Sequence, residues 1–170
     1  MSRNLKTIMI VLLVCILLLP FTACDDVYEL YKGADKKVVN IELIYYDNPD
    51  ARSNPKMKYP LDLDKLEILE TLDTDNFEGF LNKLLDIWVH GAAGIKPRLF
   101  SHDGIGVAIT YEDDSFTLIT LTNINGIYCF FEGEYDKAGN PINNGREPGP
   151  GQSGLVRGFK SLINEFFDYR

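Results

Sequence analysis

The chain of 170 residues carries 17 Lys and Arg against 25 Asp and Glu, which gives a formal net charge of −8. Apolar residues make up 45% of it, so the composition is that of a folded protein and not of a disordered tail. The length suits one domain, and three cysteines are too few for a disulfide-dense scaffold. The acidic balance disfavours a protein that works by neutralising nucleic-acid phosphates.

The first 23 residues have the pattern of a secretory signal. Arg3 and Lys6 precede an unbroken apolar run over residues 8–19, and Pro20 follows that run. The run is shorter than the roughly 20 residues that a membrane-spanning helix needs. A basic start, a short apolar centre and small residues before the cut are typical of a segment removed on export. We therefore predict that residues 1–23 are a signal peptide.

The stretch Phe21-Thr22-Ala23-Cys24 adds a sharper indication. It resembles a bacterial lipobox, in which an aliphatic residue, a small residue and Gly or Ala precede the cysteine, although Phe21 stands where Leu is more usual. The resemblance implies a lipoprotein whose Cys24 carries a diacylglyceryl group and anchors the chain in the cell membrane, facing outside the cytoplasm. The alternatives are an ordinary signal peptide cut nearby and an uncut signal anchor, and both also place the remaining chain outside the cytoplasm.

The polar residues 24–37 are interpreted as a lipidated N-terminus and tether, although Tyr28, Leu30 and Tyr31 could instead pack onto the domain. A single domain is expected over residues 38–170. Its first strand is predicted over 38–46, where β-branched and aromatic residues alternate with polar ones. The segment 61–73 fits both a strand and a helix period, and we favour a strand over 66–72 because a clearer helix follows.

That helix is predicted over 76–89 from one apolar stripe that ends at Trp88, with Asp75 and Glu78 as a capping pair. Three strands should follow. Residues 104–112 and 115–122 flank Asp113-Asp114, and Asn125-Gly126 is a strong two-residue hairpin signal before the third strand.

If both turns have two residues, the register of the three strands follows. Tyr111 then pairs with Phe116, Ile109 with Leu118, and Val107 with Thr120, on the face that also carries Cys129 and Phe131. The opposite face would carry Gly106, Ala108, Ile119, Leu121, Tyr128 and Phe130. A slip of one residue would exchange these sets.

Residues 132–154 are rich in Gly and Pro and are predicted to be a long flexible loop, with a small hairpin conceivable around 138–140. A last amphipathic helix is expected over 155–167, with Ser153 as its cap. The element order β-β-α-β-β-β-α predicts an α+β domain, mainly an antiparallel sheet of four to five strands with two amphipathic helices packed on it.

Residues able to carry chemistry are few and poorly spaced. His90, His102, Asp103 and Cys129 contain no metal-ligand spacing, so no metal site and no cofactor are predicted. Ser101-His102-Asp103 has the letters of a catalytic triad, but adjacent residues point in different directions. Cys129 is expected to be a small buried apolar residue in a strand. No catalytic residue is therefore predicted.

Acidic residues are plentiful but lie in predicted turns and at element ends, where Asp is common for backbone reasons. The pairs are Asp47 and Asp50, Asp62 and Asp64, and Asp73 and Asp75, together with Glu112, Asp113 and Asp114. Asp73-Thr74-Asp75-Asn76-Phe77 lacks the third acid and the Gly of a calcium-binding loop.

One surface is left as a candidate contact. Ile119, Leu121, Tyr128 and Phe130 make a sheet face more apolar than solvent would leave it, and it is either covered by the C-terminal helix or exposed as a binding patch. We expect a non-catalytic binding or interaction module at the membrane, for an envelope protein or a small ligand and not for nucleic acid. The alternatives are a cell-envelope enzyme and a structural accessory protein without a discrete ligand.

Overall fold

The computed structural model describes residues 27–29, 31, 33–48, 61–90, 102–124, 127–142 and 153–169. The signal segment, Cys24 and the turn residues 125 and 126 lie outside the described residues. The elements, in chain order, are β1 (Val27–Glu29), the 3-10 turn η1 (Gly33–Asp35), β2 (Val38–Tyr46), η3 (Leu63–Lys65), β3 (Leu66–Thr71), η4 (Thr74–Asn76), α2 (Phe77–Leu85), β4 (Trp88–His90), β5 (Gly104–Tyr111), β6 (Phe116–Ile124), β7 (Ile127–Tyr135) and α3 (Ser153–Phe166).

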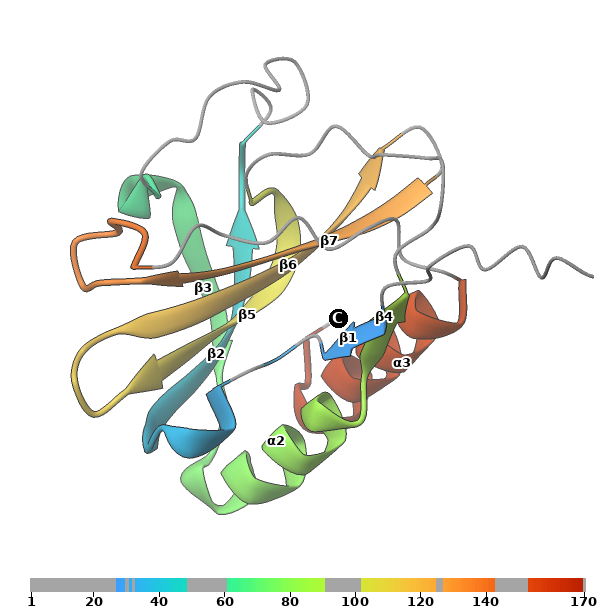
Figure 1. The fold of residues 1–170 in the computed structure, drawn as a ribbon, viewed down its shortest axis with the longest axis horizontal. Coiled ribbons are helices and arrows are strands. Elements are labelled where there is room, and N and C mark those ends of the chain that lie inside the picture. The colour runs from blue at the N-terminus through green and yellow to red at the C-terminus, as the bar shows by residue number, and fades with distance from the viewer. Residues whose placement is uncertain are drawn as a thin grey trace, which may run out of the picture.

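Five strands form one antiparallel sheet in the order β3-β2-β5-β6-β7, and α2 and α3 pack against one of its faces (Figure 1). The predicted α+β class, with an antiparallel sheet and two amphipathic helices, is confirmed. A separate two-stranded ribbon of β1 and β4 was not predicted.

The first two strands of the sheet follow the sequence pattern closely. β2 has the predicted bounds, and its side chains alternate between the helix-covered face, with Ile41 and Leu43, and the opposite face, with Ile44 and Tyr46. The segment 61–73, which fitted both a strand and a helix period, contains the strand β3 over Leu66–Thr71, close to the strand predicted over 66–72. Because β3 carries a bulge opposite Leu43 and Ile44, Leu69 also packs into the helix-side core.

The helix prediction needs a correction at its end. α2 stops at Leu85, and Trp88 lies in β4, where its backbone pairs with Glu29. Trp88, the last residue of the predicted apolar stripe, therefore pairs with a strand that lies nearly 60 residues earlier in the chain. The predicted cap also differs, because the carboxylate of Asp73 accepts from the backbone N–H of Asp75 at the start of η4.

The turn between β5 and β6 overturns the predicted register. Thr110 pairs with Phe116 and Val107 with Ile119, one residue away from the expected pairing. The turn has three residues, 112–114, and Asp114 adopts a φ of 62°, as the last position of a three-residue hairpin loop requires. Val107, Ile109 and Tyr111 therefore share the helix-covered face with Ile119 and Leu121, and not with Phe116 and Leu118.

The second hairpin agrees with its prediction, since Ile124 pairs with Ile127 across Asn125-Gly126. β7, however, continues to Tyr135, so the first residues of the predicted loop 132–154 are strand. A tight turn follows over 136–140, where the Asp136 carboxylate accepts from the backbone N–H groups of Ala138 and Asn140. Residues 143–152 lie outside the described part of the chain.

The N-terminal segment belongs to the domain from residue 27 onward. β1 pairs with β4, and the side chain of Tyr31 is only 1% exposed within the helix-side core. Of the two interpretations of residues 24–37, the structure therefore agrees with the second, in which Tyr31 packs onto the domain.

Two hydrophobic clusters lie on the two faces of the sheet. The helix-side cluster joins β2, β5, β6 and β7 to α2 and α3, with Phe80, Leu84 and Phe159 fully buried at its centre. The cluster on the opposite face is smaller and is built on Ile44, Tyr46, Leu61, Ala108, Leu118 and Tyr135.

Candidate functional site

The predicted contact surface of Ile119, Leu121, Tyr128 and Phe130 does share one face of β6 and β7, but this face is covered. Ile119, Leu121 and Phe130 are at most 4% exposed, and the ring of Phe130 meets that of Phe159 from α3 edge to face at 5.3 Å. These three residues are core, which corrects their interpretation as an exposed patch. The alternative, cover by the C-terminal helix, is what the structure has.

Tyr128 alone reaches the rim of this face. It is half-buried, and its hydroxyl accepts a hydrogen bond of 3.0 Å from Nζ of Lys160 on α3. The same ammonium lies 4.3 Å from the centre of the Tyr128 ring, in cation–π contact.

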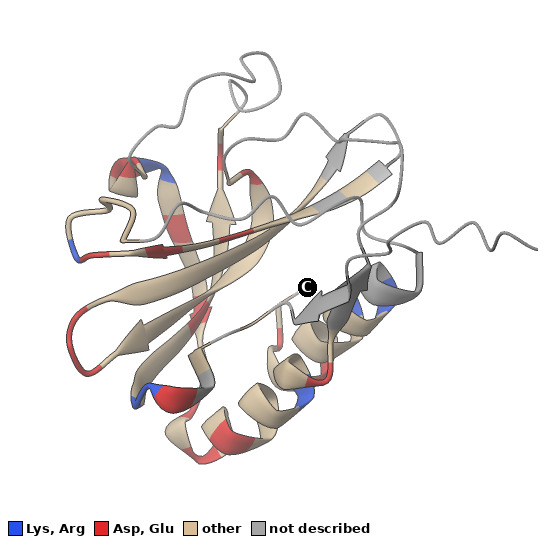
Figure 2. Ribbon diagram, in the orientation of Figure 1, with Lys and Arg blue, Asp and Glu red and all other residues tan. Residues whose placement is uncertain are grey.

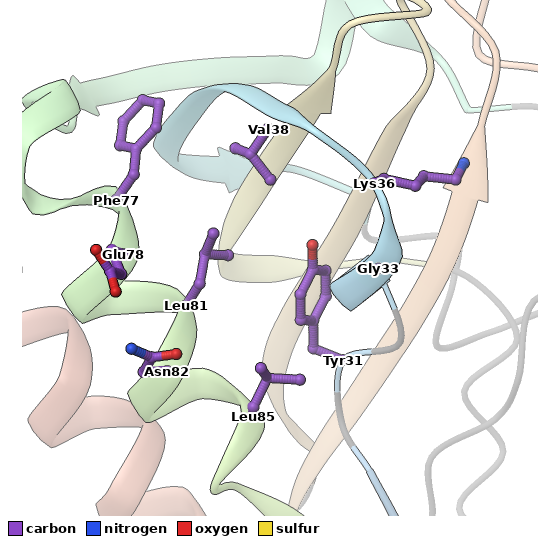
Figure 3. A pocket seen from close by; sticks show the side chains of 9 residues that line it. All are labelled: Tyr31, Gly33, Lys36, Val38, Phe77, Glu78, Leu81, Asn82 and Leu85. Carbon is purple, nitrogen blue, oxygen red and sulfur yellow. The ribbon is translucent and has the colours of Figure 1, made fainter.

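A pocket lies elsewhere, between the segment 31–38 and α2, with a volume of about 320 Å³. Figure 3 shows Leu81 and Leu85 of α2 pointing toward the ring of Tyr31, which comes from the opposite wall. Val38 and Phe77 complete the apolar lining. The volume is at the lower end of the roughly 300–1,000 Å³ typical of small-molecule sites.

Polar groups surround this apolar interior. Glu78 and Asn82 lie on the outer face of α2 at the pocket, and both are exposed. Lys36 lines the opposite side, but Figure 3 shows its side chain extending away from α2. It forms an ion pair with Glu134 of β7, and its Nζ lies 4.7 Å from the centre of the Tyr111 ring. The bond to Glu134 raises the pKa of Lys36, so the ammonium stays charged and engaged outside the pocket.

The hydroxyl of Tyr31, which lines the pocket, belongs to a chain of buried hydroxyl groups. The Tyr111 hydroxyl lies 3.3 Å from that of Tyr31 and 2.6 Å from Oγ1 of Thr117. Burial raises the pKa of both tyrosines, so the two phenols are neutral at physiological pH. Gly33 sits against both hydroxyls, and a Cβ there would collide with the Tyr31 oxygen at 2.5 Å. A glycine at position 33 therefore lets the N-terminal segment pass close to the two tyrosine hydroxyls.

His102 lies on the opposite face of the sheet and is fully buried. Its Nδ1 is 3.0 Å from Oγ1 of Thr120, and its ring and that of Phe131 form a T-shaped pair at a centroid distance of 4.6 Å. Its Nε2 has no hydrogen-bond partner among the described residues. Burial lowers the pKa of His102 to about 3, so the imidazole is neutral at physiological pH.

Asp103 is also buried, and its roles are structural. Its carboxylate accepts from the backbone N–H of Asn48 and from the hydroxyl of Thr122. His102 and Asp103 are both closed off from solvent, so among the described residues they do not line an open cleft. Ser101 and the side chains of His90 and Cys129 lie outside the described residues.

Three of the carboxylates named from the sequence, those of Asp62, Asp73 and Asp113, accept hydrogen bonds in turns. Asp62 and Asp73 accept from the backbone N–H two residues later, and Asp113 accepts from the N–H and hydroxyl of Ser115. These hydrogen bonds hold the pKa of Asp113 below its usual range. Across the described ranges, no group of three His, Cys, Asp or Glu side chains is arranged to hold a metal ion.

Comparison with known proteins adds no relative: no family model matches the chain, and neither a curated protein nor a solved structure matches it significantly. Within the described residues, no helix is long and apolar enough to span a membrane.

Sequence reasoning missed the pocket because its two walls are separated by some 40 residues of chain and share no motif. The available signal was the aromatic and aliphatic content of residues 28–31, which a plain tether would not need.

Proposed function

We propose that this chain is an extracytoplasmic lipoprotein, anchored in the membrane through Cys24, that acts as a non-catalytic binding module for a small ligand with an apolar body. The observation that carries the ligand proposal is the pocket between residues 31–38 and α2. Its apolar walls and small volume suit a compact apolar group.

The polar groups at this pocket narrow the ligand chemistry. The nearest cation, Lys36, is held by Glu134, whereas Glu78 and Asn82 present a carboxylate and an amide beside the opening. An anionic ligand would meet the Glu78 carboxylate without a compensating cation. A neutral or cationic ligand with one hydrogen-bonding group therefore fits best.

The ligand proposal is tested by filling the pocket. Leu81→Trp places an indole between Tyr31 and α2, and Leu63→Trp makes the same change at an exposed leucine as a control. The lipidated full-length protein is purified from membranes and studied by native mass spectrometry. We expect a bound small molecule on the wild type and on Leu63→Trp, and at least a tenfold lower occupancy on Leu81→Trp. Equal occupancy in all three, or none in any, would contradict the proposal and favour a structural role.

The anchor is tested separately by the mass of the mature protein. We expect Cys24 at the N-terminus with added lipid, and loss of membrane association in Cys24→Ala. An unmodified wild type, or a Cys24→Ala variant that stays equally membrane-bound, would refute lipidation and leave the pocket proposal standing.

A further inference from the structure

The position of β1 limits how far the domain can move from a lipid on Cys24. β1 begins at Val27 and pairs with β4. Three residues of extended chain span at most about 11 Å, against about 45 Å if all residues from 24 to 37 formed a free tether. With the anchor of the proposed function in place, the domain is therefore held close against the bilayer.

One end of the domain lies near the start of β1, and therefore near the anchor, and the other end lies far from it. In Figure 1, the β1–β4 ribbon and the first turns of α3 lie on the right, while η1 and the turn between β5 and β6 lie on the left. Strand pairing supports this division. Phe116 opposite Tyr135 places the turns 112–114 and 136–140 together at one end of the sheet, and Ile124 opposite Ile127 marks the other.

The two ends also differ in charge: acidic residues gather in the turns at the far end, and two basic residues of α3 lie near the ribbon. The two left-hand turns carry four acidic residues, Glu112, Asp113, Asp114 and Asp136, against one basic residue, Lys137 (Figure 2). Near the ribbon, the exposed residues Arg157 and Lys160 lie three apart on α3, and so on one side of the helix. Lys36 and Lys37 at the acidic end are held by carboxylates, whereas Lys160 contacts the phenol of Tyr128.

From these observations we infer that the domain docks on an anionic phospholipid surface through Arg157, Lys160 and Tyr128. This inference rests on the proposed lipid anchor. Arg and Lys pair with lipid phosphates, and tyrosine is a residue favoured at the membrane–water interface. The acidic turns then face away from the lipid phosphates.

The experiment compares two labels on the lipidated full-length protein in vesicles. In a Cys129→Ala background, a fluorophore is placed at Ser161→Cys on α3 or at Lys137→Cys in the turn 136–140, both exposed positions. The vesicles contain phosphatidylethanolamine with or without phosphatidylglycerol, and the readout is energy transfer to a lipid-bound acceptor. We expect clearly higher transfer from position 161 than from position 137, and a larger difference with phosphatidylglycerol.

Charge reversal then identifies the contact. Arg157→Glu combined with Lys160→Glu should abolish the difference between the labels, whereas Lys37→Glu combined with Lys65→Glu makes the same charge change elsewhere and should preserve it. A Gly/Ser linker of about ten residues before Val27, with a root-mean-square span of roughly 17 Å, should reduce the difference. Circular dichroism checks the fold of each variant.

The outcomes separate the two proposals. Equal transfer from both labels in a lipidated, vesicle-bound wild type, or a difference that survives reversal of Arg157 and Lys160, overturns the docking surface and leaves the anchor intact. A protein that carries no lipid overturns both.

Discussion

The two faces of the sheet are buried by different means. Beneath α2 and α3 aromatic rings pack against one another, as Phe80 does with Phe166 and Phe130 with Phe159, and the buried hydroxyls of Tyr31, Tyr111 and Thr117 form one hydrogen-bonded chain. On the opposite face, a smaller apolar cluster encloses His102, Asp103 and the hydroxyls of Thr120 and Thr122. The first face should respond mainly to lost volume, whereas the second should respond to protonation and to the loss of individual hydrogen bonds.

The largest expected effect comes from truncating the helix-side core. Phe130→Ala should lower the free energy of unfolding by about 3–5 kcal/mol, because it removes a ring that is 1% exposed and leaves a cavity against Phe159. Urea denaturation followed by circular dichroism measures the change.

The control for that truncation lies on the edge strand β3. Ile68 is 54% exposed, so Ile68→Ala should change stability by less than about 0.5 kcal/mol. Similar losses in the two variants would mean that α3 does not seal the face as described.

The opposite face should be sensitive to pH through His102. Burial lowers its folded-state pKa to about 3, while an unfolded His titrates near 6.5. Between these values the unfolded chain binds a proton that the folded chain excludes. This contribution to stability is therefore complete above about pH 6.5 and is lost as the pH falls, by up to about 1.4 kcal/mol per pH unit.

Two variants isolate this titration. His102→Leu and His102→Gln should both flatten the dependence of unfolding free energy on pH between about 6.5 and 4.5, whatever their own stability. The groups around the ring are the phenols of Tyr46 and Tyr135 and the carboxylate of Asp103, which is held by Asn48 and Thr122. A wild-type slope that persists in both variants would show that another group titrates.

The same contrast explains what could be predicted from sequence. β2 was predicted within its observed bounds because alternation is a property of neighbouring residues. The β5–β6 register was not, since Glu112-Asp113-Asp114-Ser115 suits a turn of two or three residues. A usable signal was present in β5, where Val107, Ile109 and Tyr111 alternate with Gly106 and Ala108: the larger residues had to meet the helices.

The site was harder to predict because it depends on contacts between distant segments. The burial of Tyr31 depends on Tyr111, and the end of α2 depends on the pairing of β4 with β1. Nothing in Ser101-His102-Asp103 indicated that His102 would be enclosed by rings from β2 and β7. The sequence did allow one alternative that the structure has, in which the C-terminal helix covers the face that carries Phe130. The apolar stripe of that helix supported it.

Two glycine substitutions should change stability by small amounts of opposite sign. Gly139 closes the turn against Leu61 of the polar face; its φ is 81°, and an added Cβ would meet the Leu61 carbonyl oxygen at 2.6 Å. Gly139→Ala should therefore cost about 1–2 kcal/mol from the left-handed backbone and the displaced Leu61. Gly158, on the exposed side of α3, has no atom within 4 Å of such a Cβ, and Gly158→Ala should stabilise the protein by about 0.4–1 kcal/mol.

Thermal unfolding of both variants measures the two changes in stability. Equal shifts of one sign would mean that the turn 136–140 does not pack on Leu61, and that the polar face is closed by other contacts.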